Sequence, residues 1–275
     1  MMKIFITGAS SGIGEALAYA YSKRKCIVGL SARRVDLLKS ILIKCEELGG
    51  SPFMYKLDVQ NPDDCKLAAH SFMLDAGGID IVIANAGIGG DDNLYSGSSN
   101  DINNILKTNL QGVNNTLMPF IPKMKEQKKG KLVCISSVAG FIPIPFHGGY
   151  AGSKVAIRMI FDSWRPTLEK NGIKTICICP GFIDTPIVTG LARKIPMVSP
   201  NKAAEKLTPS QLVPVNPVGH VHVYSFTPLL QVPSFWHGEL AHLFIVSHAI
   251  TRNLPNSNPA LHLDHNPTVL AWFVG

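Results

Sequence analysis

The chain has 275 residues, of which 46% are hydrophobic and 16% charged, a composition typical of a compact folded protein rather than a disordered one. No run of about 18 apolar residues occurs, so we expect no membrane span, and the N-terminal residues lead directly into an apolar strand, which favours a cytoplasmic location. The net charge of +7 is not gathered into a basic run, so we expect no nucleic-acid partner.

Short apolar runs alternate with helical patterns through the first ~180 residues, which predicts an α/β fold with a doubly wound parallel, Rossmann-like sheet. Such a sheet binds ligands at the carboxyl ends of its strands. Strands are predicted at residues 3–6, 27–31, 53–57, 79–84, 131–135 and 174–178. Helices are predicted at residues 12–23, 35–48, 62–76, 101–127, 150–171 and 200–207.

The pattern changes near residue 211. From there to residue 275 the chain holds seven of its nine histidines and seven of its nineteen prolines, which leaves little room for regular elements. We therefore predict a cofactor-binding catalytic domain over residues 1–210 and a divergent tail over 211–275, with one short helix at 238–250 and no further strand. The tail is either a genuine covering segment or a product of a changed reading frame.

Neither the histidines nor the cysteines have the spacing of a metal site. The tail histidines have no accompanying cysteines and match no zinc template well, so we expect no metal. The six cysteines include no CxxC pair, which favours buried, reduced thiols over a disulfide framework.

A glycine-rich loop follows the first predicted strand and opens the first predicted helix. Gly8 permits the tight turn, Gly12 lets the backbone approach a pyrophosphate, and Gly14 allows close packing of helix on strand. The helix N-terminus offers N–H groups and a positive dipole end to phosphate. The sequence therefore predicts a dinucleotide site on this loop, which also contains Ser10, Ser11 and Ile13.

The end of the second strand predicts the choice of nicotinamide cofactor. An NAD-preferring protein usually has a carboxylate there for the ribose 2′-hydroxyl, whereas this chain has Ala32 followed by Arg33 and Arg34. A guanidinium can pair with a 2′-phosphate, so we expect NADP(H) to be favoured over NAD(H). The alternative is that both arginines belong to a solvated helix start. Asp58 ends the third strand, where it can accept from the adenine amino group or cap the next helix.

A tyrosine and a lysine lie one helical turn apart. Tyr150 and Lys154 have i,i+4 spacing and share one helix face. A phenol keeps its proton near neutral pH, and a nearby ammonium favours the phenolate, which suits acid–base work. Ser137 ends a strand 13 residues earlier, so its hydroxyl can bind the substrate oxygen at the same sheet edge. Asn109 lies inside a helical pattern, and taken by itself we interpret it as a structural residue rather than a catalytic one.

Together these motifs resemble the short-chain dehydrogenase/reductase family, in its NADP-preferring one-domain branch, over about residues 1–207. The residues that carry the resemblance are the glycine loop, Asn85-Ala86-Gly87, Asn109, Ser137, Tyr150, Lys154, Pro180-Gly181 and Thr185. The resemblance implies reversible hydride transfer between NADP(H) and a carbonyl or secondary alcohol, without a metal. The implied partner is a small carbonyl or alcohol substrate.

The resemblance also implies a function for each matched position. Tyr150 would be the general acid/base, Lys154 would bind the nicotinamide ribose, and Ser137 would hold the substrate oxygen. Asn109 would hold a relay water, Thr185 would contact the carboxamide, and Arg33 the 2′-phosphate. The other implied cofactor contacts are Arg34, Asp58, Val59, Asn85, Ala86, Gly87, Pro180, Gly181 and Ile183.

Two departures from the family pattern are visible. Ala84 replaces the first asparagine of the usual Asn-Asn-Ala-Gly, and the family's last strand is not found in the tail, which places homo-oligomer formation in doubt. The expected substrate wall is apolar, favouring an apolar or aromatic carbonyl compound, and consists of Phe141, Ile142, Pro143, Ile144, Phe146, Phe182 and Ile187.

Two other functions remain open. The first is an NADP(H)-binding protein without turnover, acting as a sensor or an inactive relative with an altered tail. The second is an epimerase or dehydratase of the extended branch, whose glycine pattern and substrate domain this chain does not match well.

Overall fold

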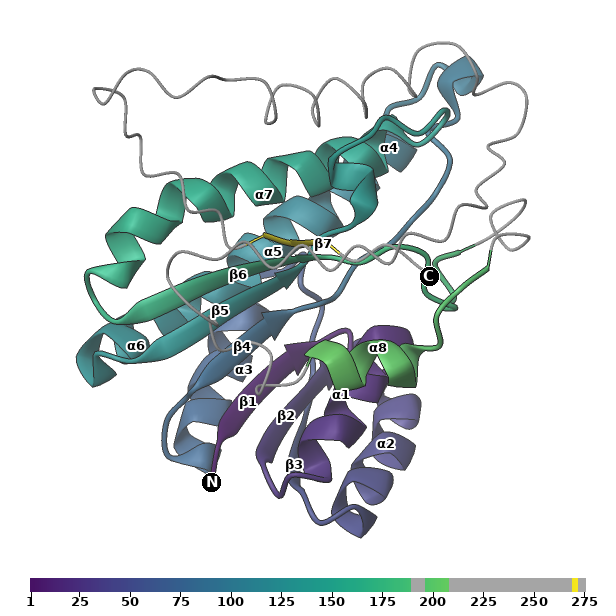
Figure 1. The fold of residues 1–275 in the computed structure, drawn as a ribbon. Helices are drawn as coiled ribbons and strands as arrows, with labels where there is room; N and C mark the ends of the chain where they lie inside the picture. Colours follow the sequence, from purple (N-terminus) through teal and green to yellow (C-terminus); the bar gives the residue numbers. More distant parts are fainter. Residues whose placement is uncertain (189–195, 208–268, 272–275) are drawn as a thin grey trace, which may run out of the picture. The chain divides into compact units, whose positions relative to one another are not determined.

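The first strand lies inside a parallel sheet, between the second and the fourth (Figure 1). The structure, a computed structural model, describes residues 1–188, 196–207 and 269–271, which belong to one unit of the chain. The strand order is β3-β2-β1-β4-β5-β6-β7 and every pairing is parallel. The strands are β1 (Lys3–Thr7), β2 (Ile27–Ala32), β3 (Ser51–Lys56), β4 (Ile81–Ala84), β5 (Gly130–Ile135), β6 (Ile173–Cys179) and β7 (Val269–Ala271).

Continuous apolar runs form the central strands because helices cover both faces of the sheet. All four residues of β4 are buried, as are the last four of β1. The six strands predicted from the sequence are all present, with ends within two residues of the expected ones. The predicted doubly wound fold is therefore confirmed.

The helices form one layer on each face of the sheet (Figure 1). One layer packs α1 (Gly12–Ser22), α2 (Val35–Glu47) and α8 (Pro200–Leu207) against the sheet. On the other face lie α3 (Pro62–Ala76), α5 (Gly112–Leu117), α6 (Ile121–Gln127) and the 22-residue α7 (Gly148–Glu169). Against α7 packs α4 (Asn100–Leu106). Among the described residues no helix is long and apolar enough to cross a membrane.

The single helix predicted at residues 101–127 is wrong in detail, because the structure divides this segment. After α4 comes the π-helical segment η2 (Lys107–Gln111), and after α5 comes a 3-10 turn, η3 (Met118–Phe120). Pro119 has no N–H to continue an α-helix, which accounts for η3. Asn109 bonds to backbone outside the helix, at the point where the π-helical turn widens the backbone.

The expectation that the tail contains no strand is also corrected. Residues Val269–Ala271 pair in parallel with Cys177–Cys179 at the outer edge of β6. Three residues are too few for a periodic signal in the sequence, so the partner strand alone reveals this one. The predicted helix at 238–250 and the tail histidines lie outside the described residues, and the boundary at residue 210 stays a prediction.

All six cysteines are free and buried, as predicted. Burial raises the pKa of Cys65 to about 12. Cys177 hydrogen bonds with Cys134, and this contact together with burial raises its pKa; a bond with Cys177 and burial do the same for Cys179. These thiols stay protonated at neutral pH. Within the described part of the chain, no group of three or more His, Cys, Asp or Glu has the arrangement of a metal site.

We expect Phe5→Ala to cost about 3–5 kcal/mol of unfolding free energy, the usual loss for a buried Phe. The Phe5 ring is buried and its centroid lies 5.1 Å from that of Phe120 and 5.4 Å from that of Phe72. Urea unfolding measures the loss. Leu74→Ala is the control because this side chain is exposed, and it should change stability by less than about 0.5 kcal/mol. Equal losses in the two variants would contradict the placement of Phe5 at the centre of this core.

Candidate active site

The site lies where the strand order changes direction. β1 connects onward to its neighbour β2, whereas the chain reaches β4 on the other side of β1 only later. The loops that leave the carboxyl ends of β1 and β4 therefore diverge and leave a crevice, the usual ligand position in such sheets. The glycine loop follows β1, and Asn85-Ala86-Gly87 follows β4.

Hydrogen bonds join these two loops directly. The Thr7 hydroxyl accepts from the backbone N–H groups of Asn85 and Ala86, both at 3.2 Å. In return the Asn85 amide donates to the carbonyls of Thr7 at 3.0 Å and Gly8 at 3.3 Å. Asn85 thus supports the turn of the glycine loop.

The glycine loop has the backbone that its sequence predicts. Gly8 and Gly12 have φ values of +67° and +62°, a region that disfavours other residues. A Cβ on Gly14 would lie 2.4 Å from the Gly8 carbonyl oxygen, so this position requires glycine. Ser11 precedes α1 and its side chain does not cap the helix, so that N-terminus remains available to an anion. Ile13 packs partly buried against the sheet.

The two arginines lie at the rim of this loop, in different contacts. The Arg34 guanidinium donates to the hydroxyl of Ser10 at 2.9 Å and of Ser11 at 2.7 Å. Arg33 lies 3.9 Å from the Asp58 carboxylate across the ends of β2 and β3, with both side chains well exposed. Arg34 is therefore the closer of the two to the loop.

Asp58 and Val59 follow β3. The Asp58 carboxylate accepts from the backbone N–H of Gln60 at 3.0 Å. The cap of the next helix is Asn61, so the alternative in which Asp58 caps α3 is wrong. The Val59 carbonyl accepts from Asn115 at 2.9 Å, which ties this strand end to α5.

Tyr150 and Lys154 share one face of α7, as predicted from their spacing. The Lys154 Nζ lies 5.4 Å from the centre of the Tyr150 ring. The lysine side chain is only 6% exposed and donates to the carbonyl of Ile135, the last residue of β5, at 2.9 Å. One sheet strand therefore fixes the ammonium beside the phenol.

Ser137 lies two residues after β5, in extended backbone. Its hydroxyl oxygen accepts from the Ala139 N–H at 3.1 Å, which leaves its own hydrogen for donation to a second group. The neighbouring Ser136 donates to the Lys154 carbonyl at 3.0 Å. Ser136 thus connects the end of β5 with α7, while Ser137 is held by the turn that follows it.

The segment after β6 lies along the same crevice. The Pro180 carbonyl accepts from Val138 at 3.0 Å, beside Ser137. Gly181 follows it, Ile183 is buried and forms a bridge with Val198, and Thr185 lies against the glycine loop. A Cβ on Gly12 would come within 3.0 Å of the Thr185 methyl group.

Asn109 reaches the crevice from the π-helical segment. Its amide oxygen accepts from the Ile88 N–H at 2.8 Å, and its nitrogen donates to the Ile88 carbonyl at 2.9 Å and to the Ser153 hydroxyl at 3.3 Å. The amide is therefore engaged with the protein, as the structural interpretation expected. A Cβ on Gly87 would lie 3.3 Å from the Asn109 oxygen and 3.8 Å from Lys154 Nζ, so these three residues meet at one point.

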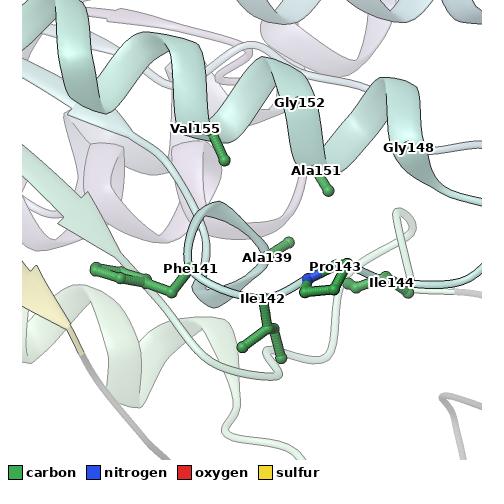
Figure 2. A pocket seen from close by; sticks show the side chains of 9 residues that line it. All are labelled: Ala139, Phe141, Ile142, Pro143, Ile144, Gly148, Ala151, Gly152 and Val155. Atoms are coloured by element: carbon green, nitrogen blue, oxygen red, sulfur yellow. The ribbon is translucent and has the colours of Figure 1, made fainter. Parts of the chain in front are cut away.

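Four residues of the predicted substrate wall line a cavity of about 360 Å³ beside α7 (Figure 2). Figure 2 shows Ala151 and Val155 pointing from α7 toward the segment that carries Ala139 and Ile142. No predicted catalytic residue lines the cavity, but Ala151 lies three residues before Lys154 and is therefore its neighbour on the helix surface. The lining consists of Ala139, Phe141, Ile142, Pro143, Ile144, Gly148, Ala151, Gly152 and Val155.

The expected wall is therefore divided. Ile187 lies close to Gly89, since a Cβ there would be 3.1 Å from the Ile187 side chain, and these two residues approach each other from the segments after β6 and β4. Phe146 is exposed, and Phe182 is half-buried beyond the end of β6.

Comparison with known proteins agrees with this arrangement. Residues 2–195 match the family model described as short chain dehydrogenase. The chain belongs to the short-chain dehydrogenase/reductase family. It is therefore an oxidoreductase acting on CH–OH and C=O groups with a nicotinamide cofactor, as the predicted family membership implied.

Individual relatives are similar over most of their length. An uncharacterized oxidoreductase of Myxococcus xanthus is 35% identical over 65% of this chain and 70% of its own. The 3-oxoacyl-(acyl-carrier-protein) reductase of Thermotoga maritima is 32% identical over 69% of this chain and 77% of its own. The crystal structure of an alcohol dehydrogenase from Thermococcus sibiricus, complexed with 5-hydroxy-NADP, is 30% identical over 75% of this chain and 89% of its own, with a TM-score of 0.69.

Sequence reasoning missed several residues that hold this site together. Thr7 and Ser153 bond to Asn85 and Asn109 respectively, and neither had been assigned a function. Asp92 bonds to the first turn of α7. A partner 56 residues away in the chain leaves no local signal.

Two helical glycines provide a matched test of the geometry of the phosphate cradle, by which we mean the glycine loop from Gly8 to Gly14. We expect Gly14→Ala to destabilise the protein by about 1–3 kcal/mol, because the new methyl group meets the Gly8 carbonyl. Around Gly152 a Cβ would find open space, so Gly152→Ala should stabilise by about 0.5–1 kcal/mol through helix propensity. Thermal unfolding of both variants measures the difference, and a stabilising Gly14→Ala would contradict this backbone.

Proposed function

We propose that this chain is an NADP(H)-dependent carbonyl reductase or alcohol dehydrogenase in which Tyr150 exchanges the proton with the substrate oxygen. The observation that carries the proposal is the buried Lys154 ammonium, fixed on the Ile135 carbonyl beside the Tyr150 ring. A fixed ammonium beside a phenol stabilises the negative charge that develops on the phenol oxygen as it gives up its proton, which is what a tyrosine acting as acid and base requires.

The residues of the crevice fit a dinucleotide. A Cβ at Gly8 would lie 2.8 Å from the Ala86 Cα, and at Gly12 3.0 Å from Thr185, so the cradle is open only because these positions are glycine. The helix N-terminus behind it carries no side-chain cap from Ser11. Both features suit the close approach of a pyrophosphate to backbone N–H groups.

On this basis the glycine loop, from Gly8 to Gly14 with Ser10, Ser11 and Ile13, would hold the pyrophosphate. Asp58 and Val59 would contact the adenine, and Lys154 the nicotinamide ribose. The segments after β4 and β6 would line the nicotinamide side with Asn85, Ala86, Gly87, Pro180, Gly181, Ile183 and Thr185. When bound, the cofactor supplies or takes up the hydride.

The chain's own residues supply the proton and the position. In the reducing direction the Tyr150 hydroxyl donates its proton to the carbonyl oxygen, and in the oxidising direction the phenolate takes it back. The Ser137 hydroxyl donates a hydrogen bond to the same oxygen and so fixes the substrate. Asn109 keeps the loop after β4 in place through Ile88, while the π-helical backbone around it would hold a water that returns the proton.

The preference for NADP(H) rests on the two arginines at the cradle rim. Arg34, anchored on Ser10 and Ser11, and Arg33, beside Asp58, place two guanidinium groups where a 2′-phosphate would lie. Ala32 supplies no carboxylate to repel that phosphate. Both arginines thus favour the phosphorylated cofactor.

We expect Tyr150→Phe to lower turnover by about 10²–10⁴-fold, the usual contribution of a positioned acid/base, with NADPH binding retained. The measurement is NADPH oxidation with a panel of aliphatic and aromatic aldehydes, ketones and diketones. Tyr55→Phe is the matched control, because its hydroxyl contacts Asp75 and lies outside the crevice. NADPH binding without turnover of any panel member by the unaltered protein would favour a sensor over an enzyme.

Arg34→Ala should weaken NADPH binding by about 10–100-fold, since a hydrogen bond to a charged group contributes roughly 1.5–3 kcal/mol. NADH binding should change little. Calorimetric titration with each cofactor measures both affinities, and Arg24→Ala, beyond the opposite end of α1, is the control. Equal losses for the two cofactors would contradict recognition of the 2′-phosphate.

A further inference from the structure

We propose that Asp92 is a positioning residue for Tyr150, acting as a long-range cap of the helix that carries the phenol. Asp92 lies in the loop after Asn85-Ala86-Gly87, and its carboxylate contacts the first turn of α7, two residues before Tyr150. The inference rests on the proposed function, because it assigns a residue that sets the rate of that same reaction.

The Asp92 carboxylate is engaged on both of its oxygens. Oδ1 accepts from the Gly149 N–H at 2.9 Å, and Oδ2 accepts from the Gly148 N–H. The residue is only 4% exposed, and burying a carboxylate is costly unless hydrogen bonds compensate it. These two hydrogen bonds therefore form a specific, buried contact rather than an incidental one at the surface.

The helix needs this contact because nothing adjacent in the sequence caps it. The residue before α7 is His147, whose side chain makes no cap hydrogen bond but lies 2.7 Å from the Gly90 carbonyl. The first N–H groups of a helix have no partner within it, and Gly148-Gly149 is a poor helix start. A carboxylate at this end also interacts favourably with the helix dipole.

The two glycines and the preceding backbone are adapted to the carboxylate. A Cβ on Gly148 would lie 3.0 Å from Oδ2, and one on Gly149 3.1 Å from Oδ1, so larger residues would crowd Asp92. Phe146 has a φ of +62°, a strained conformation for a bulky residue. Its carbonyl accepts from the Asp92 N–H at 2.8 Å, so Asp92 holds the segment on both sides of the helix start.

The same loop is fixed at its other end near the reaction centre. Ile88 bonds to Asn109 through both backbone groups, and Asn109 in turn bonds to Ser153 on α7. The Ser153 hydroxyl donates to the Tyr150 carbonyl at 2.6 Å. Tyr150 is therefore held between two contacts of one loop, and loss of the Asp92 contact leaves its turn of helix supported on one side.

Proton transfer depends steeply on the position of the donor, and a displacement of about 1 Å can cost about 100-fold in rate. The glycine loop lies between β1 and the first turn of α1, outside the segment that Asp92 touches. We therefore expect a loss of Asp92 to lower turnover far more than it lowers cofactor affinity, most of which would come from the glycine loop. A merely structural function would lower both, through a smaller folded fraction.

The test compares Asp92→Ala, Asp92→Asn and the neighbouring control Asp91→Asn, whose carboxylate accepts within its own loop, from the Asn93 N–H. The probes are NADPH and the diketones 2,3-butanedione and 9,10-phenanthrenequinone. We expect Asp92→Ala to lower kcat by about 10–100-fold, with a much smaller change in the calorimetric Kd for NADPH. Asp92→Asn, which keeps one acceptor oxygen, should recover part of kcat, and Asp91→Asn should match the unaltered protein.

A second measurement does not require turnover. Hydrogen exchange of the peptide covering residues 148–154 should be faster in both Asp92 variants and unchanged in Asp91→Asn. Unchanged exchange in Asp92→Ala overturns the proposal whether or not the protein is active, as does a parallel loss of kcat and NADPH affinity. If the unaltered protein binds NADPH but reduces no panel compound, the proposed function is wrong. The positioning function is then wrong too, even if hydrogen exchange shows that Asp92 caps α7.

Discussion

The reciprocal hydrogen bonding between the ends of β1 and β4 is the constraint on which the site depends. Thr7 accepts from the backbone of Asn85 and Ala86, and the Asn85 amide donates to the carbonyls of Thr7 and Gly8. These are buried or half-buried polar groups at a sheet edge, where an unpaired one would be costly. The bonds fix the glycine loop over the crevice and bring Gly87 next to Asn109 and Lys154.

The second half of the site is built on one long helix, α7. Toward the sheet, α7 presents Tyr150 and Lys154, and the lysine is anchored on the last residue of β5. Next to them, Ala151, Gly152 and Val155 line an apolar cavity between α7 and the segment 139–144 (Figure 2). The apolar space thus lies next to the chemistry on the helix surface, because residues three apart, such as Ala151 and Lys154, are neighbours there, although no predicted catalytic residue lines the cavity itself.

Irregular backbone occurs where the site needs side chains to leave the regular pattern. The π-helical turn at Lys107–Gln111 directs Asn109 to Ile88, and the strained Phe146 precedes the helix that carries Tyr150. Such strain persists only where surrounding contacts over-determine the backbone. Here those contacts come from the loop after β4, so this loop links the cofactor crevice to the proton-transferring helix.

Much of this protein follows from local sequence. The apolar runs determined six strands, since parallel strands covered on both faces must be apolar throughout, and the glycine spacing determined the cradle, since only glycine adopts those φ values freely. The i,i+4 spacing placed Tyr150 and Lys154 on one face. The sequence family followed from the order of these motifs. Each of these features depends on residues within a few positions of one another.

Only the tertiary structure decided the rest, because the partners are distant in the chain. The sequence could not show that Lys154 bonds to Ile135, that Arg34 rather than Arg33 lies on the loop serines, or that the cap of α7 comes from Asp92. Nor could it show β7, three residues long and visible only through its pairing with β6. A local pattern specifies which element a residue joins, whereas a hydrogen bond across the fold depends on where the sheet brings two strand ends together.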